Sequence, residues 1–365
     1  MSNFTVTADR IADLIPMFAL AKRVPVFTGR PGIAKTAFTN QAAAEMTARN
    51  KSLGVADPDV VIRELHLASM SEVDVRGYLI PFNGHATFTA PEFWSTVEKH
   101  QRGILFLDEF MQATPEVQKA VAPLILERRI GEYQLPEGWS IVLAGNGLED
   151  GAGANALLTH IVNRVVMINV VAPDPDVWCS WAVSAQLAPE LIAFAKIRPD
   201  VVFDSEIPSA ANTPYCTVRS LHALADIAKA YPGGIRSMVD DKFGTALIAG
   251  AIGEGPASEV AAVVRTAINL PSYEAVVNDP SGTVLPTKPD QVYAMVMLLA
   301  VRAKLEHADQ VVEYMARFQP NHAVTGIISL VRRDRSFARS KQMMNWVMAN
   351  KSMLEKFGKY ISESL

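Results

Sequence analysis

The clearest chemical signal lies in residues 26–36, where an apolar strand leads through a Gly/Pro-rich turn into a helix. Gly29 and Gly32 permit this turn and let backbone N–H groups face a polyphosphate at the positive end of the helix. Lys35 would reach the β- and γ-phosphates, and the Thr36 hydroxyl would bind Mg²⁺. The segment therefore predicts a loop that binds the phosphates of a nucleotide.

This loop departs from the general pattern GxxxxGK[ST] at one position, since Ala34 takes the place of the second glycine. A strand-turn-helix junction with a chance glycine and lysine is the alternative. If the loop binds a nucleotide, the contacting residues are those of the turn and of the first helical positions, namely Gly29, Arg30, Pro31, Gly32, Ile33, Ala34, Lys35, Thr36 and Ala37.

A second signal is the apolar run from Gly103 to Leu107, which ends in two adjacent carboxylates, Asp108 and Glu109. A buried strand would deliver both acids to the carboxyl edge of a sheet, where open α/β sheets bind ligands. Asp108 would hold the Mg²⁺ shell, and Glu109 would polarise or orient the water that attacks the γ-phosphorus. Acids also suit the first turn of a helix, so a helix N-cap is the alternative.

The order and spacing of these segments support a common site. Lys35 and Asp108 are 73 positions apart, which leaves room for the helix, strand and insertion needed to bring their two strands side by side. A third strand, residues 141–144, ends in Gly145 and Asn146 and places a polar amide at the same edge. We therefore expect the three strand ends to meet.

The elements that position these residues follow from the pattern between Val24 and Val171. Short β-rich apolar runs alternate there with helical stretches, which indicates a parallel sheet covered by helices. The runs are apolar on both faces, as strands between two helical layers are. The expected strands are Val24–Thr28, Val60–Leu65, Ile104–Leu107, Ile141–Ala144 and Val165–Val170. The expected helices between them are Lys35–Asn50 and Pro115–Arg128.

After Ala172, prolines punctuate a segment with few β-runs, which predicts a domain boundary near residue 172. Helical patterns follow at Val218–Ala230, Met238–Ile252 and Glu259–Leu270. A Pro/Ser/Asp-rich crossing, residues 271–289, then precedes two or three further helices. We expect three parts, which are residues 1–172, 173–275 and 276–365.

Composition argues against several other classes of protein. The 365 residues carry a formal net charge of −4, so no global basic character indicates a nucleic-acid partner. The longest fully apolar run, Ala294–Val301, is much shorter than the roughly 18 to 20 residues that span a membrane. Residues 1–10 show no basic region followed by an apolar stretch, so we expect a cytoplasmic location.

The cysteines and histidines indicate neither a disulfide framework nor a zinc site. Cys179 and Cys216 are too far apart for a CxxC pair, and we expect both to be ordinary buried thiols. The seven histidines are scattered without HExxH spacing.

At the loop and the acidic strand end the chain resembles the AAA+ ATPases, most closely the MoxR-type branch, whose phosphate loop commonly reads GxPGxAKT. The resemblance extends from about Val24 to about Ala230. It is also carried by Asp74–Gly77 with Pro81, Phe88–Trp94, Leu107–Glu109 with Gln112 and Ala113, Glu127–Tyr133, and Gly138 with Trp139. These segments are similar to those of MoxR-like ATPases encoded beside von Willebrand A-domain proteins.

The resemblance implies roles for three further residues. Asn146 matches the sensor-1 residue, which positions the lytic water together with Glu109. Arg164 matches the arginine finger, which reaches the γ-phosphate bound in a neighbouring subunit, although Val165 stands where the family usually has phenylalanine. Arg219 matches sensor 2, which contacts the nucleotide of its own subunit. The alternatives are an edge-strand cation paired with an acid for Arg164 and a helix-capping or solvated side chain for Arg219.

The family also implies an overall design. It implies an α/β fold, in which a RecA-like three-layer αβα P-loop core with a parallel sheet is followed by an α-helical lid and C-terminal helices. It further implies hydrolysis of ATP with Mg²⁺, with Mg²⁺ bound by Thr36 and Asp108. The catalytic residues would be Lys35, Glu109, Asn146 and Arg164.

The implied assembly is a homo-oligomeric ring, expected as a hexamer, that acts on a von Willebrand A-domain protein or another protein client, without a membrane or nucleic acid. A nucleotide-gated ring-assembly module with little hydrolysis and a DNA-directed ATPase are the alternatives. Glu109 argues against the first of these, and the acidic balance of the chain argues against the second.

Two segments carry less specific signals. Arg129–Trp139 predicts a hairpin that would project toward a central pore, with a plain surface hairpin as the alternative. His85, Phe88 and Trp94 form an aromatic stretch that could touch a threaded polypeptide, but we expect it to pack in the core.

Overall fold

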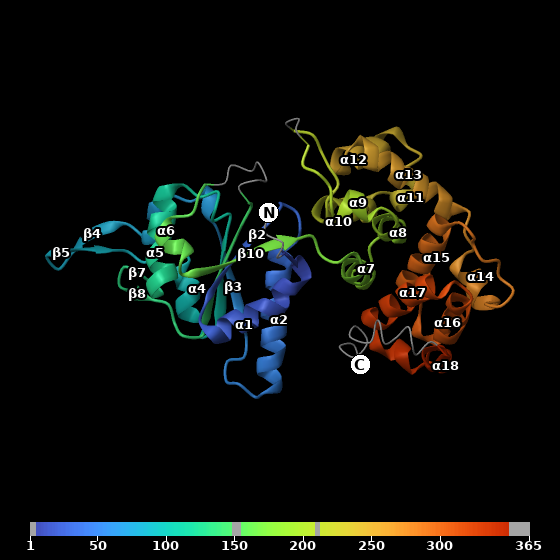
Figure 1. Cartoon of the computed structure of the whole chain (residues 1–365), viewed down its shortest axis with the longest axis horizontal. Coiled ribbons are helices and arrows are strands. Elements are labelled where there is room, and N and C mark those ends of the chain that lie inside the picture. Colours follow the sequence, from blue (N-terminus) through green and yellow to red (C-terminus); the bar gives the residue numbers. More distant parts are fainter. Residues whose placement is uncertain (1–4, 148–154, 209–211, 350–365) are drawn as a thin grey trace. The chain divides into compact units, whose positions relative to one another are not determined.

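The computed structural model describes residues 5–147, 155–208 and 212–349. The chain divides into two compact units, residues 1–173 and 174–365 (Figure 1). Residues 350–365 of the expected C-terminal region lie outside the described residues. The finer division of the second unit into a lid and a C-terminal region stays a prediction.

The first unit contains a six-stranded parallel sheet with the strand order β1-β10-β2-β9-β6-β3. All five predicted strands are confirmed, with ends that differ by at most two residues. Their bounds are β2 Val24–Thr28, β3 Val61–His66, β6 Gly103–Asp108, β9 Trp139–Gly145 and β10 Val165–Val171. The sixth strand, β1 (Thr5–Thr7), is too short to give a pattern in the sequence.

The expectation that β2 and β6 lie side by side is wrong, because β9 lies between them. Leu143 of β9 is the register partner of Val26 in β2 and of Leu107 in β6. A seven-residue strand that is almost entirely buried suits the centre of the sheet. Asn146 directly follows β9, the strand that separates β2 from β6.

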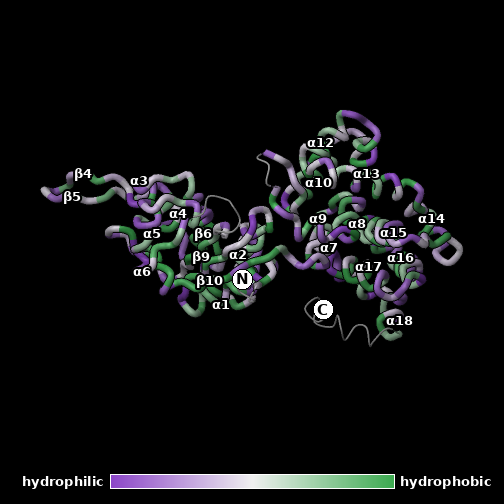
Figure 2. The backbone as a smooth tube through the Cα atoms, turned by 45° about the horizontal axis from the view of Figure 1, so that its top comes forward, coloured by the Kyte–Doolittle hydropathy of each residue, from purple (hydrophilic) through white to green (hydrophobic). Residues whose placement is uncertain are grey.

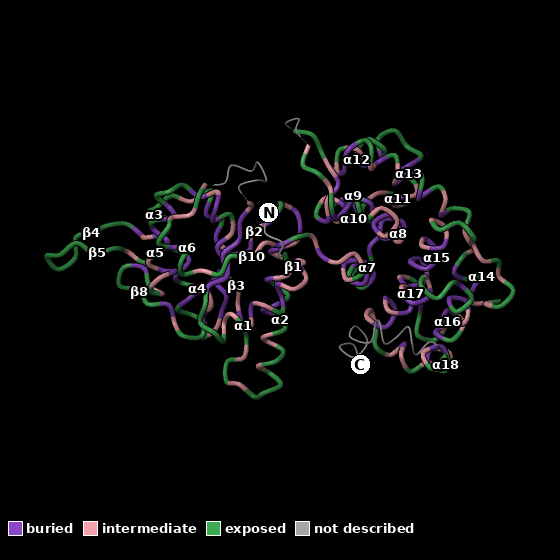
Figure 3. Tube along the Cα trace, viewed as in Figure 1, coloured by how far each residue is buried: buried purple, intermediate pink, exposed green. Residues whose placement is uncertain are grey.

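Helices cover both faces of the sheet. Neighbouring residues of a strand point to opposite faces, so each central strand contributes to two core clusters. Ile104 and Phe106 of β6 pack in one core cluster, and Leu105 and Leu107 pack in the other. The first cluster includes α1 (Ile11–Ala21) and α2 (Lys35–Ser52). The second includes α3 (Glu72–Arg76), α4 (Trp94–Lys99), α5 (Pro115–Glu127) and α6 (Thr159–Val162). The predicted three-layer αβα fold is confirmed, and its buried strands are visible in Figure 3.

Two hairpins extend this unit. The predicted hairpin after α5 is confirmed as β7 (Arg129–Ile130) paired with β8 (Tyr133–Gln134). A second hairpin, β4 (Leu79–Phe82) and β5 (His85–Phe88), projects from the unit (Figure 1). Core packing is right for Trp94, which is 3% exposed, but wrong for His85 and Phe88, which are exposed on this hairpin.

The second unit consists of helices in its described residues. Its helices are α7 Pro175–Ser184, α8 Pro189–Ile197, α9 Pro199–Val202, α10 Val218–Ala230, α11 Gly234–Met238, α12 Lys242–Ile252, α13 Glu254–Ile268, α14 Tyr273–Asn278, α15 Pro289–Arg302, α16 Ala308–Ala316, α17 Pro320–Arg333 and α18 Lys341–Ala349. Five of them begin with proline, which lacks an N–H and suits the first helical turn. Figure 2 shows hydrophobic and hydrophilic stretches alternating along these helices, as expected for helices with one buried face.

The predicted helix Val218–Ala230 is confirmed with both ends correct. The predicted helix Met238–Ile252 is confirmed as α12 with its end correct, but α12 begins later, at Lys242, because Met238 ends α11 and Asp241 caps the start of α12. The Asp241 side chain accepts a hydrogen bond from the N–H of Gly244, at 3.0 Å.

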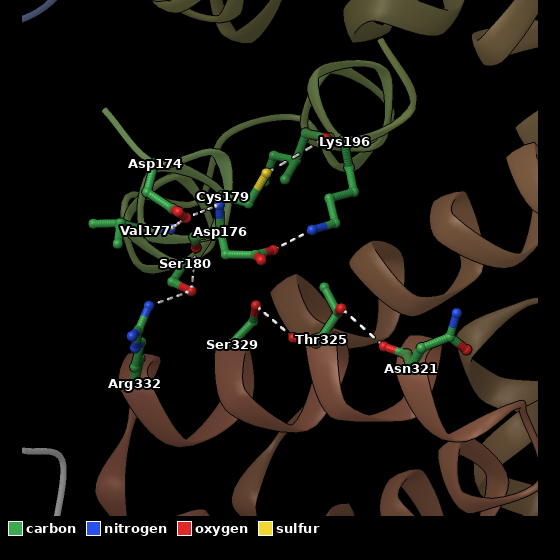
Figure 4. Close-up of polar contacts among 11 residues, drawn as sticks. Asp174, Asp176, Val177, Cys179, Ser180, Lys196, Asn321, Thr325, Ser329 and Arg332 are labelled. Carbon is green, nitrogen blue, oxygen red and sulfur yellow. Dashed lines mark hydrogen bonds and ion pairs between the residues drawn. The ribbon is translucent and has the colours of Figure 1, made fainter. Parts of the chain in front are cut away.

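Helices from both halves of the second unit pack together, with α7 against α17 and α8 against α15. In Figure 4 the Arg332 guanidinium donates to the Ser180 hydroxyl at 3.0 Å, and Lys196 pairs with Asp176. Cys179 is buried beside these groups, and burial raises the pKa of its thiol to about 12. Cys216 is also a free buried thiol, as expected.

None of the helices in the described ranges combines the length and the apolar character that crossing a membrane requires.

Candidate functional site

The loop between β2 and α2 is tightly packed and has two residues with left-handed backbone. A Cβ on Gly29 would lie 2.1 Å from the carbonyl oxygen of Val170 in β10, so only glycine fits there. Gly32 has a φ of +80° and Ala34 a φ of +70°. The loop therefore has a glycine-like backbone at Gly32 and at the second glycine position of the motif, although alanine occupies that second position.

Replacement of Ala34 by glycine is expected to raise the free energy of unfolding by about 1 kcal/mol, because a left-handed φ places the alanine Cβ close to backbone oxygen. The matched control is Ala44→Gly at an exposed position inside α2, which is expected to lower the free energy of unfolding by about 1 kcal/mol. Urea unfolding of the two variants measures both changes. A loss of stability in Ala34→Gly would contradict the backbone conformation assigned to this loop.

Lys35, the first residue of α2, holds the loop and a neighbouring strand end together. Its side chain is buried, with the residue 9% exposed, and its ammonium donates to the carbonyl oxygens of Gly29 at 2.6 Å and Arg30 at 3.1 Å. It also donates to Oδ1 of Asn146 at 3.4 Å. Two of the three predicted strand ends, those of β2 and β9, are thus joined through one cation.

The acidic strand end lies at the same edge of the sheet. Asp108 ends β6, and the next backbone N–H after Glu109, that of Phe110, donates to the Ala144 carbonyl of β9 at 2.9 Å. Glu109 is exposed and has a φ of +56°, a left-handed conformation that is strained for this residue. Its N–H donates to the Asp108 carboxylate at 2.9 Å. The Asp108 carboxylate is therefore held by the backbone of the next residue, while the Glu109 side chain stays exposed.

Gln112 is a positioning residue to which the sequence motifs assigned no role. Its Oε1 accepts the N–H of Asn146 at 3.3 Å, and its Nε2 donates to the Asn146 carbonyl at 3.4 Å. Both backbone groups of Asn146 are therefore held by one side chain that follows β6. Gln112 and Asn146 are 34 positions apart in the sequence. They meet because β6 and β9 are adjacent strands of the sheet.

Asp108 also belongs to a cluster with Glu64 and His66 at the end of β3, which sequence reasoning missed. His66 is the register partner of Asp108, and ligand atoms of the three side chains lie within 4.8 Å of one another. Burial raises the pKa of the Glu64 carboxyl, His66 acts against this and Asp108 adds to it. Carboxylate oxygens of this kind, together with the Thr36 hydroxyl, are donors that suit Mg²⁺.

The two predicted arginines are not at this edge of the described first unit. Arg164 immediately precedes β10, so it lies at the amino edge of the parallel sheet, opposite the phosphate loop. Arg219 belongs to the second unit, where it is exposed in the first turn of α10 beside a Thr217–Ser220 capping box. Its approach to a nucleotide stays a prediction.

No family model matches this sequence, and no curated protein matches it. Similar solved structures include the RuvB Holliday junction branch migration motor of Thermotoga maritima, with 14% identity, a TM-score of 0.34, and 74% of each chain covered. Another is NtrX from Brucella abortus in complex with ATP, with 15% identity, a TM-score of 0.34, and coverage of 97% of this chain and 69% of that chain. Similarity at this level assigns no function to the chain.

Proposed function

We propose that the chain is an ATP-hydrolysing motor of the MoxR type of AAA+ ATPase, which forms a ring and remodels or activates a protein partner. The observation that carries this proposal is the buried ammonium of Lys35, which contacts both the Gly29–Ala34 loop and Asn146. A cation in this place can exchange its carbonyl partners for the phosphate oxygens of ATP without moving to another part of the fold.

The residues around Lys35 supply the remaining roles in hydrolysis. The exposed carboxylate of Glu109 would accept a proton from the attacking water, and the amide of Asn146, held by Gln112, would orient that water. Thr36 and Asp108 would hold Mg²⁺, which neutralises charge on the β- and γ-phosphates when it is bound. Arg219 would contact the nucleotide of its own subunit, as sensor 2 does in the family.

The projecting hairpin supports a protein client for this motor. Tyr78, Leu79 and Phe82 are each at least 60% exposed there, and Phe88 is also exposed. Exposed apolar side chains suit a polypeptide better than a phosphate backbone. A von Willebrand A-domain protein is the proposed client, and a hexamer is the proposed ring.

Lys35→Ala is expected to weaken ATP binding by about 10- to 100-fold, because it removes a charge-assisted hydrogen bond to phosphate. Equilibrium titration with a fluorescent ATP analogue measures this change. Lys51→Ala is the matched control, since Lys51 lies at the other end of α2 in an exposed ion pair with Asp59 at 3.0 Å. A Lys35→Ala variant that folds and binds ATP like the wild type would contradict the proposed function.

A further inference from the structure

Three core strands are each preceded by an arginine. Arg23 stands before β2, Arg102 before β6 and Arg164 before β10. Because the sheet is parallel, all three lie at its amino edge, while the phosphate loop, Asp108 and Glu109 lie at the carboxyl edge. The amino edge thus carries a row of arginines, whereas the carboxyl edge carries Asp108 and Glu109 beside Lys35.

Arg23 and Arg164 are neighbours within this row. Val24 and Val165, the residues after them, are register partners on the adjacent strands β2 and β10. Adjacent strands lie about 4.8 Å apart, so the two arginines begin from neighbouring backbone positions. Both line one pocket of about 500 Å³ in the first unit, together with Lys22 and Arg128.

The backbone at Arg23 is held in place by the end of α1. The N–H of Arg23 donates to the Phe18 carbonyl at 3.0 Å, the N–H of Lys22 donates to the Ala19 carbonyl at 3.2 Å, and Lys22 has a φ of +51°. This left-handed helix ending satisfies the last carbonyls of α1 and turns the chain directly into β2. The backbone of Arg23 is therefore held in place, while its side chain is exposed.

The pocket contains little negative charge to balance these cations. Glu137 is its one acidic lining residue, and its carboxylate is paired with Lys22 at 3.2 Å. The Arg128 guanidinium donates to the carbonyl oxygens of Pro136 at 2.9 Å and Trp139 at 2.7 Å. Within the ranges that the structure describes, the guanidinium groups of Arg23 and Arg164 make no ion pair or hydrogen bond.

Two neighbouring cations without a counter-charge repel each other, so an anion bound between them would relieve that repulsion. The opposite edge of the same unit carries negative charge, since Glu64, Asp108 and Glu109 lie there. The proposed ATP site lies at that edge too, so a second copy of the chain could supply the anion. Arginines on one edge of the sheet and carboxylates on the other favour head-to-tail contact between copies of the chain, which closes into a ring or continues as a filament.

We propose that Arg23 is a second cation, beside Arg164, that binds the γ-phosphate of ATP held by a neighbouring copy of this chain. This inference rests on the proposed function and adds a residue that the sequence motifs do not contain. The two guanidinium groups would share the charge that develops on the γ-phosphoryl oxygens. Arg23 contributes nothing to its own subunit's phosphate loop, which lies at the other edge of the sheet.

Arg23→Ala is expected to lower kcat for ATP hydrolysis by about 10- to 100-fold, the size expected for one charge-assisted hydrogen bond, with ATP affinity unchanged. Arg23→Lys is expected to recover part of kcat, because it keeps the charge but loses the planar fork. Arg10→Ala is the matched control, since Arg10 lies elsewhere in the first unit and pairs with Asp13 at 3.0 Å. Mixing Arg23→Ala with Lys35→Ala is expected to restore activity above that of either variant alone.

The outcomes separate this inference from the proposed function. An Arg23→Ala variant with wild-type kcat, beside an inactive Arg164→Ala variant, would overturn the role of Arg23 and leave the ATPase intact. The same holds if Arg23→Ala keeps wild-type kcat and changes only the binding of duplex DNA or of inorganic triphosphate. If Arg23→Ala does not fold, an Arg23→Lys variant with unaltered kcat, KM and salt dependence would also overturn it. A wild-type chain that does not bind ATP would overturn both proposals.

Discussion

Exchange of Glu109 for glutamine is expected to lower kcat for ATP hydrolysis by about 10²- to 10⁴-fold, the range found for loss of a general base. The amide keeps the size of the side chain and its exposed position after β6, but it cannot accept the proton of the attacking water. Binding of ATP depends on Lys35 and the loop, so affinity is expected to stay at the wild-type value. Phosphate release measured beside equilibrium ATP binding separates the two effects.

The backbone at Glu109 makes this substitution informative. With a φ of +56° and an N–H bonded to Asp108 at 2.9 Å, the position is set by the main chain and not by the carboxylate itself. Glutamine is therefore expected to occupy the same place. Glu116→Gln, at an exposed position in the first turn of α5, is the control for loss of one negative charge nearby in sequence. Normal turnover in Glu109→Gln would remove Glu109 from the mechanism.

The sheet could be predicted from the sequence because its strands are continuous apolar runs that end in polar residues. Gly103–Asp108 is buried from Gly103 to Leu107, and Val24–Thr28 is buried from Val24 to Phe27. Such runs reveal a strand but not its neighbours, since burial on both faces looks the same at every central position. For this reason the insertion of β9 between β2 and β6 was not predicted.

The exposed hairpin was missed for a different reason. The aromatic residues of β5 suggested a core segment, because large apolar side chains are usually buried. The turn carried the better signal, since Asn83 and Gly84 have φ values of +50° and +78°, and Asn-Gly between two short strands is typical of a two-residue hairpin. Turn chemistry here indicates the structure more directly than hydrophobicity does.

The candidate site was predictable where a short segment or the end of a strand carries it, and not where the register between strands decides which side chains meet. The phosphate loop lies within the eight residues from Gly29 to Thr36, so it can be recognised from that segment alone. The contact of Gln112 with Asn146 and the alignment of His66 with Asp108 exist only through strand register, which no local pattern specifies. The same register brings Arg23 beside Arg164.

Replacement of Arg164 by alanine is expected to leave ATP binding intact and to lower hydrolysis by about 10³- to 10⁵-fold, the effect of an arginine finger supplied by a neighbouring subunit. The place of Arg164 supports action on a neighbour, because it precedes β10 at the edge opposite its own phosphate loop. A guanidinium at that edge would neutralise charge on the γ-phosphoryl oxygens of ATP in the next copy. Steady-state hydrolysis and ATP binding by the isolated variant measure both parts.

A mixture of two inactive variants tests whether the site is shared. Arg164→Ala keeps an intact phosphate loop, and Lys35→Ala keeps an intact Arg164, so a head-to-tail pair of the two contains one complete site. Activity is expected to appear on mixing and to depend on the ratio of the two chains. Arg10→Ala in place of Arg164→Ala controls for loss of an exposed arginine elsewhere in the first unit, where Arg10 pairs with Asp13 at 3.0 Å. If the two inactive variants assemble together and their mixture stays inactive at every ratio, Arg164 acts within its own subunit or supports the fold, and the shared site is excluded.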